Sequence, residues 1–257
     1  MKPSPRHQQI VELVKQKGYV STEELVETFE VSPQTIRRDL NELADNQQIR
    51  RYHGGATAAL SSENTAYSTR KSQNLSEKDR IAEQLAQHIP DGATLFIDIG
   101  TTPEAVAKAL SHQNKRLRVV TNNLNVASLL LANQDIHVIL AGGEVRNRDG
   151  GIVGEATLDF VQQFRLDFGI LGISGIDFDG SLLDFDYHEV RVKQAIIENS
   201  RQVFLAVDHS KFGRNAMVKL GNISQIDRLF TDQLPPASIL AILKEHEISY
   251  ETIDTPL

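Results

Sequence analysis

Residues 31–40 read Val-Ser-Pro-Gln-Thr-Ile-Arg-Arg-Asp-Leu, and this stretch decides how the N-terminal part of the chain folds. Ser32 is a residue type that caps helices, and Pro33 suits the first helical position, where no backbone N–H is needed. Apolar side chains then recur at the i, i+4, i+7 spacing of one buried helical face: Ile36, Leu40 and Leu43. We therefore expect a helix that begins at residue 33.

The rest of this helix surface carries polar and basic side chains suited to DNA. They are Ser32, Gln34, Thr35, Arg37 and Arg38. Gln and Arg side chains hydrogen-bond base edges in the major groove, and hydroxyls and a helix N-terminus hold phosphates. An ordinary amphipathic surface helix has similar features, so this helix alone leaves both interpretations open.

The segments around the helix favour the DNA-binding interpretation. Residues 6–17 have helical spacing, and Ser21 with Glu24 forms a capping box at the start of a second short helix. Residues 49–56 alternate in character and end in a Gly-Gly turn, which predicts a small β-wing. This wing carries side chains that can reach the DNA backbone or minor groove: Arg50, Arg51 and His53. Together these features predict a winged helix-turn-helix over residues 1–57.

The net charge restricts how such a domain meets DNA. The chain has 257 residues and a net charge of −7. Residues 1–60 hold eight basic and eight acidic side chains, so the remainder carries the whole excess. Because an acidic body repels DNA, contact must be local, through the arginine pairs at 37–38 and 50–51. We expect double-stranded DNA as one partner.

Composition excludes several other classes of protein. Without cysteine there is no disulfide framework, thiolate metal site or cysteine nucleophile. The mean hydropathy is −0.28, and no apolar run approaches the length of a membrane span. No hydrophobic core follows the first residues, so we expect no secretory signal. These features fit a cytoplasmic protein with no membrane partner.

Residues 58–75 lose helical periodicity and gain Ser, Thr and Asn, which predicts a linker. Residues 76–257 then form a second domain, opened by a helix that reaches Pro90. Short apolar strands alternate with helices in this domain, at residues 94–97, 117–120, 136–140, 167–171, 203–207 and 228–231. That alternation predicts an α/β fold, a Rossmann-like and mostly parallel sheet covered on both faces.

Glycines and polar residues follow the carboxyl ends of these strands, where open α/β sheets bind ligands. Gly100-Thr101-Thr102 precedes a helix and offers N–H groups, hydroxyls and a helix dipole to a phosphate, whose charge Lys211 can balance. Any one strand end is often only a turn, but five such ends converge. Our candidate ligand-binding residues are Asp98, Gly100, Thr101, Thr102, Thr121, Asn122, Asn123, Gly142, Gly143, Gly172, Asp177, Asp208 and Lys211.

His188 and Glu189 invite a catalytic or metal-binding interpretation. No second histidine stands at a ligand spacing such as i+4, so we expect no metal site. A Glu at the head of a helix is more typical of a cap. With no nucleophile elbow, Walker loop or dinucleotide fingerprint, we also expect no cofactor. An enzyme would need Glu189 or Asp98 as its base.

The chain resembles the DeoR family of bacterial transcriptional repressors over its whole length. The N-terminal signature stands at Arg6-His7, Gly18-Tyr19-Val20, Glu24-Leu25, residues 31–40 and Arg51-x-His53-Gly54-Gly55-Ala56. The C-terminal half resembles the family's sensor domain, which is similar to sugar-phosphate isomerases, glucosamine-phosphate deaminases and CoA-transferases. The branch of the family that responds to glycerol 3-phosphate is most similar over residues 98–107, 154–160, 165–177 and 208–218.

This resemblance implies a repressor of glycerol and glycerol 3-phosphate catabolism genes that glycerol 3-phosphate releases from operator DNA. It implies a phosphate-binding cleft and no retained catalysis. Three alternatives stay open: a family member that senses another sugar phosphate, an activator, and an enzyme related to sugar-phosphate isomerases. Because paired half-sites favour symmetric assemblies, we expect the chain to associate with itself as a dimer or tetramer.

Overall fold

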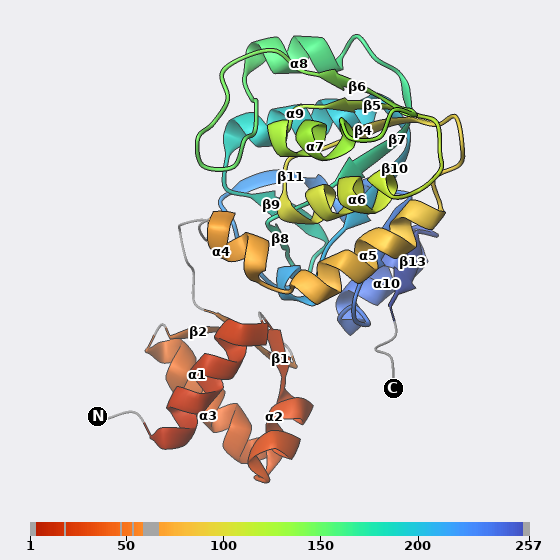
Figure 1. Cartoon of the computed structure of the whole chain (residues 1–257). Coiled ribbons are helices and arrows are strands. Elements are labelled where there is room, and N and C mark those ends of the chain that lie inside the picture. The colour runs from red at the N-terminus through yellow and green to blue at the C-terminus, as the bar shows by residue number, and fades with distance from the viewer. Residues whose placement is uncertain (1–3, 18, 47, 53, 59–66, 254–257) are drawn as a thin grey trace.

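The computed structural model describes residues 4–17, 19–46, 48–52, 54–58 and 67–253. A small N-terminal unit of helices and short strands lies beside a larger α/β unit (Figure 1). The ring of Tyr19 meets the ring of Phe178 edge-on across the two units, with 5.2 Å between ring centroids. Among the described residues, none of the helices combines the length and hydropathy of a membrane span.

The N-terminal unit is the predicted winged helix-turn-helix. Its elements are α1 (Pro5–Lys17), β1 (Tyr19–Ser21), α2 (Thr22–Phe29), α3 (Pro33–Asp45), β2 (Ile49–Tyr52) and β3 (Gly55–Ala58). The wing strands β2 and β3 pair antiparallel, and β1, which the sequence did not predict, pairs with the other edge of β3. The apolar face predicted for α3 is buried in the core that these elements share.

The larger unit is built on a seven-stranded parallel sheet with the order β13-β12-β10-β7-β4-β5-β6. Its strands are β4 (Thr94–Ile97), β5 (Leu117–Thr121), β6 (Ile136–Leu140), β7 (Leu166–Leu171), β10 (Ser200–Ala206), β12 (Arg228–Thr231) and β13 (Ser249–Thr252). Six of these strands match the six predicted apolar runs, and β13 was missed. From β4, successive strands are added toward one edge of the sheet, ending at β6. From β7, they are added toward the opposite edge, ending at β13. The direction reverses between β4 and β7, which makes their junction the topological switch point, where α/β sheets bind ligands.

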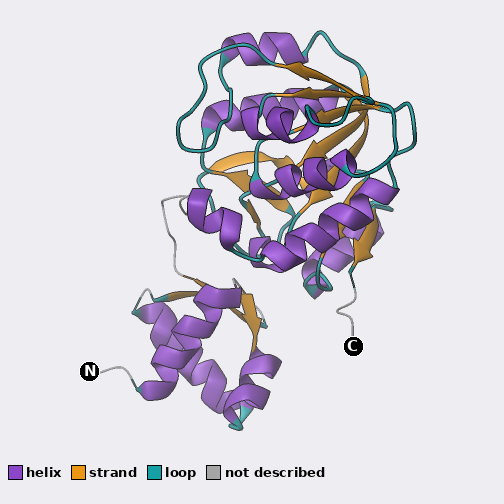
Figure 2. Cartoon of the chain, in the orientation of Figure 1, coloured by secondary structure: helices purple, strands orange, loops and turns teal. Residues whose placement is uncertain are grey.

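Helices cover both faces of this sheet (Figure 2). Residues alternate along each strand, so Leu95 and Ile97 face the core under α5, α6 and α7, whereas Phe96 faces the core under α8, α9 and α10. The bounds are α5 (Leu75–Gln87), α6 (Thr101–Ser111), α7 (Leu124–Leu130), α8 (Glu155–Val161), α9 (Tyr187–Glu198) and α10 (Ala237–Glu245), with single turns η1 (His209–Lys211) and η2 (Ile223–Gln225).

Two features of the larger unit differ from the sequence expectation. A second antiparallel sheet joins β8 (Gly175–Ile176), β9 (Ser181–Asp184) and β11 (Val218–Asn222) in the order β11-β9-β8. These strands have no continuous apolar run of the kind that marks the parallel strands. A short helix, α4 (Tyr67–Ser72), lies within residues 58–75, where we expected a linker. Residues 59–66, between β3 and α4, lie outside the described residues.

Candidate functional site

Helix α3 begins as its sequence predicts. The Ser32 side chain accepts a hydrogen bond from the Thr35 backbone N–H at 3.2 Å, and Pro33 occupies the first helical position. Ile36, Leu40 and Leu43 are buried, which turns the other faces of the helix outward. The predicted start and buried face of this helix are both confirmed.

The predicted DNA-binding residues lie at the surface of α3 and of the wing. Gln34, Arg37 and Arg38 are exposed, and Thr35 is half-buried. Arg38 Nε lies 3.2 Å from Glu42 Oε1, an i, i+4 pair on the same helix. Arg50 and Arg51 are exposed on β2, and Arg51 donates to the Asn41 side chain, which ties the wing to α3. His53 lies outside the described residues.

One groove brings the recognition helix and the wing together. Arg37 of α3 and Arg51 of β2 both line it, beside Gly54 at the wing turn. Glu23 and Glu27 of α2 line the same groove. One arginine of each pair predicted from the sequence thus lines the same groove, together with acidic side chains of α2.

Asp39 is the charged residue of the 31–40 stretch that points inward. Its side chain is only 7% exposed, and it accepts hydrogen bonds from Arg6 Nε at 2.6 Å and from His7 Nε2 at 3.0 Å. Burial alone would raise the pKa of Asp39, but the hydrogen bonds from Arg6 and His7 outweigh it and lower that pKa. The 31–40 stretch therefore carries two exposed cations, Arg37 and Arg38, and one buried anion, Asp39, which joins α3 to α1.

The larger unit has a polar cleft at the switch point of its sheet. Five predicted ligand-binding residues line it: Gly100, Thr101, Thr102, Gly172 and Lys211. Gly100 has a φ of 145° and precedes the first turn of α6, so the helix N-terminus opens toward the cleft. Residues that the sequence did not single out as ligand contacts complete the lining: Arg70, Ile99, Pro103, Asp149, Ile173, Ser174, Asp184, Glu189 and Lys193.

Cations gather around Lys211, which lines the cleft. Burial, joined by the charges of Arg214, Lys78 and Arg70, lowers the pKa of Lys211 to about 8 against the opposing charge of Asp208. The Lys211 ammonium makes no hydrogen bond or ion pair with any residue in the described part of the chain. An anion bound here would therefore meet a desolvated ammonium beside other cations.

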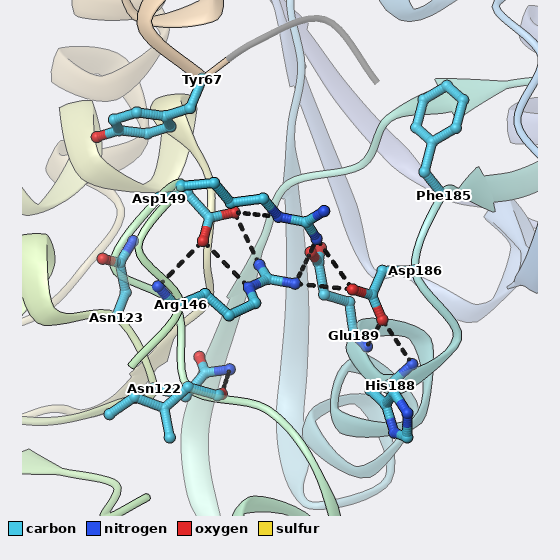
Figure 3. A network of polar contacts seen from close by, with 12 residues as sticks. Tyr67, Asn122, Asn123, Arg146, Asp149, Phe185, Asp186, His188 and Glu189 are labelled. Carbon is cyan, nitrogen blue, oxygen red and sulfur yellow. Dashed lines mark hydrogen bonds and ion pairs between the residues drawn. The ribbon is translucent and has the colours of Figure 1, made fainter. Parts of the chain in front are cut away.

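A cluster of carboxylates and arginines includes two residues of the cleft lining, Asp149 and Glu189 (Figure 3). Arg146 Nη1 lies 2.6 Å from Glu189 Oε1 and 2.9 Å from Asp186 Oδ2, and Arg146 Nη2 lies 2.8 Å from Asp149 Oδ2. Arg148 Nη2 reaches Asp186 at 2.9 Å and Glu189 at 3.3 Å. These contacts join the loop after β6 to the first turn of α9.

Glu189 has a different place from the one its sequence position indicates. The cap of α9 is Asp186, which accepts from the His188 and Glu189 backbone N–H groups at 2.8 and 3.3 Å. The Glu189 carboxylate instead lines the cleft, where burial, aided by Asp184, raises its pKa against the opposing charges of Lys193 and Arg146. Among the described residues, no cluster of His, Asp and Glu suits a metal ion.

A buried ion pair lies under the floor of the cleft. Lys193 of α9 donates to Asp98 Oδ2 and to the Gly172 carbonyl, the latter at 3.1 Å, and its Nζ lies 3.6 Å from Asp184 Oδ2. Burial lowers the pKa of Lys193, but the carboxylates of Asp98, Asp184 and Glu189 outweigh it and keep the pKa above its usual value. Asp98 is therefore a structural partner of Lys193 in this state.

The remaining predicted ligand-binding residues lie outside the cleft lining. Thr121, Asn122 and Asn123 are buried, and their side chains bond the backbone of Ile97 and Ile152 and the Glu104 carboxylate. Gly142 and Gly143 are exposed in the loop after β6. Asp177 accepts from the Phe178 N–H in a turn, and Asp208 accepts from Asn74 at 2.8 Å. Strands β5 and β6 lie beyond β4 in the sheet, away from β7, and the residues directly after them lie outside the cleft lining, although Asp149, farther along the loop after β6, reaches it.

Comparison with known families agrees with both units. The description "DeoR-like helix-turn-helix domain" matches residues 6–62, and "DeoR C terminal sensor domain" matches residues 73–233. The chain belongs to the DeoR family. The predicted family membership is therefore confirmed, and so is the combination of a winged helix-turn-helix with a parallel α/β sensor domain.

Two relatives that match nearly the whole of this DeoR-family chain carry the same name. The glycerol-3-phosphate regulon repressor of Escherichia coli (strain K12) is 66% identical over 98% of this chain and 99% of its own length. The protein of that name from Haemophilus influenzae is 60% identical over 96% of each chain. Among solved structures, eIF2B beta from Chaetomium thermophilum aligns with 94% of this chain and 82% of its own, at 14% identity and a TM-score of 0.50. This last likeness concerns the fold alone.

Proposed function

We propose that this chain is a transcriptional repressor of genes for glycerol and glycerol 3-phosphate catabolism, and that glycerol 3-phosphate releases it from operator DNA. The two relatives named as glycerol-3-phosphate regulon repressors match nearly its whole length. Their alignments, at 66% and 60% identity overall, cover both the DNA-binding and the sensor domain. An activator would use the same two domains, so the direction of regulation rests on these relatives.

The DNA-binding half of the proposal rests on α3 and the wing. We assign base contacts in the major groove to Gln34 and Arg37, and phosphate contacts to Ser32, Thr35 and Arg38. Arg50 and Arg51 of the wing would hold the flanking backbone, and His53 is assigned to the same role from its sequence position. The exposure of the four arginines, and the groove that Arg37 and Arg51 both line, support this assignment.

The observation that carries the ligand assignment is the presence of both cationic and carboxylate groups in the lining of one cleft. The α6 N-terminus with Thr101 and Thr102 shares this lining with the ammonium of Lys211, which suits a phosphate. Asp149 and Glu189 of the same lining offer carboxylate oxygens that accept hydrogen bonds from hydroxyls. A small phosphorylated polyol has a phosphate and hydroxyls in one molecule. Another sugar phosphate would use the same phosphate contacts.

We propose regulation without catalysis for this cleft. The two carboxylates that a proton-transfer enzyme would use are Asp98 and Glu189, and both are ion-paired, with Lys193 and with Arg146 respectively. A base held in an ion pair has to lose that partner before it accepts a proton from a substrate. Incubation with phosphorylated sugars, followed by product analysis, tests this point directly. Turnover would move the assignment to an isomerase-like enzyme.

The proposal also includes self-association and location. Operators with paired half-sites require a symmetric dimer or tetramer, and effector binding would favour the assembly that no longer spans those half-sites. By linkage, the effector then binds the DNA-free state more tightly. Since operator DNA is the partner, the protein would act in the cytoplasm, with no membrane, metal or cofactor in its mechanism.

The test is a titration of the protein–DNA complex at fixed salt. A promoter fragment from a glycerol-catabolism operon is bound, and glycerol 3-phosphate, ribose 5-phosphate and glucose 6-phosphate are added separately. We expect glycerol 3-phosphate to release the DNA at concentrations at which ribose 5-phosphate and glucose 6-phosphate leave the complex intact. Release by another phosphate alone would keep the mechanism and change the effector. Absence of specific DNA binding would overturn the proposal.

A further inference from the structure

In the sequence, α4 follows the wing and precedes α6, whose first residues line the sensor cleft. Eight residues, 59–66, separate the end of β3 from Tyr67 at the start of α4. Even fully extended, this segment spans only about 30 Å. Along the chain, α4 is therefore the first described element after the wing.

Hydrogen bonds fasten both ends of α4 to the sensor domain. The Tyr67 hydroxyl donates to Glu104 Oε2 at 2.6 Å and accepts from Asn125 Nδ2 at 3.1 Å. At the other end, the buried ammonium of Lys78 donates to the Arg70 carbonyl at 2.5 Å and to the Gln73 carbonyl at 2.6 Å. Glu104 belongs to the first turn of α6, whose N-terminus opens onto the cleft, so α4 is tied directly to the cleft wall.

The packing of α4 itself is slight. None of its six residues is buried, so hydrogen bonds and charge hold it more than apolar contact does. Elements with few buried contacts open at low free-energy cost. The position of α4 is therefore sensitive to a change in the charges around it.

Arg70 brings such a charge into the cleft. Its side chain lines the cleft together with Thr101, Thr102 and Lys211. Arg70 is among the cations that disfavour the charged form of Lys211, so the two side chains lie close enough to repel each other. A phosphate dianion between them would remove that repulsion and add charge-assisted hydrogen bonds.

From this arrangement we propose that Arg70 contacts the phosphate of the effector, and that α4 carries occupancy of the cleft to the segment leading to the wing. The proposal rests on the function proposed above and deepens it by naming the residue and the helix that report occupancy. Arg70 is then a ligand-binding residue, and Tyr67 is a positioning residue that acts through Glu104. Binding and transmission are separable because they use different side chains of one short helix.

Arg70→Gln in the full chain tests the binding step, and Lys71→Gln is the matched control. Lys71 is the next residue of α4 and lines a different groove, between α5, α6 and α7. We expect Arg70→Gln to weaken glycerol 3-phosphate binding by tenfold or more in calorimetry, and Lys71→Gln to stay within threefold of wild type. Operator affinity without effector should stay within threefold in both variants. Equal affinity of Arg70→Gln and wild type, or equal losses in both variants, would overturn the assignment of Arg70.

A second measurement keeps this test independent of the effector's identity. Inorganic phosphate should raise the unfolding temperature of wild type and of Lys71→Gln, and should do so much less for Arg70→Gln. If glycerol 3-phosphate failed to release wild type from DNA while this difference persisted, the proposed function would fail and Arg70 would stand as an anion contact. Identical protection of all three proteins would sink the Arg70 assignment alone.

Tyr67→Phe tests transmission because it removes only the hydroxyl that bonds Glu104 and Asn125. The informative quantity is the effector concentration for half-release divided by the effector dissociation constant, both for glycerol 3-phosphate. We expect this ratio to rise at least fivefold in Tyr67→Phe. An unchanged ratio would show that α4 does not transmit occupancy, whatever the variant does to affinity. The ratio in Lys71→Gln should match wild type.

Discussion

Asp39 on α3 accepts a hydrogen bond from Arg6 Nε on α1 at 2.6 Å, across 33 residues of sequence. The contact joins the recognition helix to the helix that opens the domain, and His7 completes it at 3.0 Å. Asp39 follows Arg37 and Arg38, which both face solvent. One short motif thus supplies the solvent-facing cations and the anion that joins the helix bearing them to α1.

Asp39→Asn should destabilise the N-terminal domain by about 2 kcal/mol, because the buried carbonyl that remains cannot pair with Arg6 as an anion does. The loss is no larger because the Arg6 side chain is 35% exposed, so solvent screens its ion pair with Asp39. Hydrogen exchange of the α1 and α3 amides in the full chain measures this local opening. Asp45→Asn, at the exposed end of α3, is the control and should change exchange little.

Arg37→Ala and Arg38→Ala should weaken operator binding in different ways. Losing Arg37 removes a base contact, so we expect a loss of about 1–3 kcal/mol on the operator and relaxed base preference at one position. Losing Arg38 removes a phosphate contact, so its loss should be similar on operator and random DNA and should reduce the salt slope by about one. Competition binding against operators with single base changes, at two salt concentrations, distinguishes them. If Arg37→Ala kept full base preference, α3 would contact only the backbone.

Local sequence signals were enough to predict the N-terminal domain and the main strands. Ser32, Pro33 and the apolar spacing after them determine one helix through interactions within a few residues. The buried strands were equally visible as continuous apolar runs, such as 94–97 and 203–207. The strands β8, β9 and β11 lack such a run, because β8 has two residues and polar residues or glycine interrupt β9 and β11.

Only some of the cleft-lining residues were predicted, because the order of the strands in the sheet decides which strand ends meet at the cleft. The ends of β4, β7 and β10 lead to residues that do line it, such as Gly100, Gly172 and Lys211. The sequence does not give strand order, so it could not separate these from the ends of β5 and β6. Arg70 was missed because the Ser- and Thr-rich residues around it predict a linker. Lys193 was missed because a lysine on a helix is usually solvated, and only tertiary contact places it against Asp98.

Lys193→Met should destabilise the sensor domain by about 3–5 kcal/mol, because it leaves the buried carboxylates of Asp98 and Asp184 without their cation. For a domain of this size, that corresponds to a fall in unfolding temperature of about 10 °C, measurable by circular dichroism. Adding Asp98→Asn to Lys193→Met removes one of the orphaned charges, so the double variant should be more stable than the single one. A single variant within 1 °C of wild type would mean that the pair contributes little.

Lys211→Ala should leave operator binding unchanged and raise the effector concentration for half-release by about tenfold or more, because one charge-assisted hydrogen bond to phosphate is lost. The measurement is the same DNA-release titration in wild type and variant. Lys219→Ala, on β11 and outside the cleft lining, is the control. Unchanged effector affinity in Lys211→Ala would show that the phosphate binds elsewhere.

Effector binding should also weaken above pH 8. Burial holds the pKa of Lys211 at about 8, below its ordinary value, so the free protein loses this proton as the pH rises through 8. A bound phosphate dianion favours the ammonium and raises that pKa, so binding above pH 8 takes up a proton. Affinity should therefore be nearly constant from pH 7 to 7.5 and then fall by up to about tenfold per pH unit. The effector's own second phosphate pKa, about 6, lies below this range.

Calorimetry between pH 7 and 9.5 in buffers of different ionisation enthalpy measures both the affinity and the proton uptake. Lys211→Met should bind weakly with no slope, and a wild-type affinity that is flat to pH 9.5 would show that Lys211 does not meet the effector as a titrating cation.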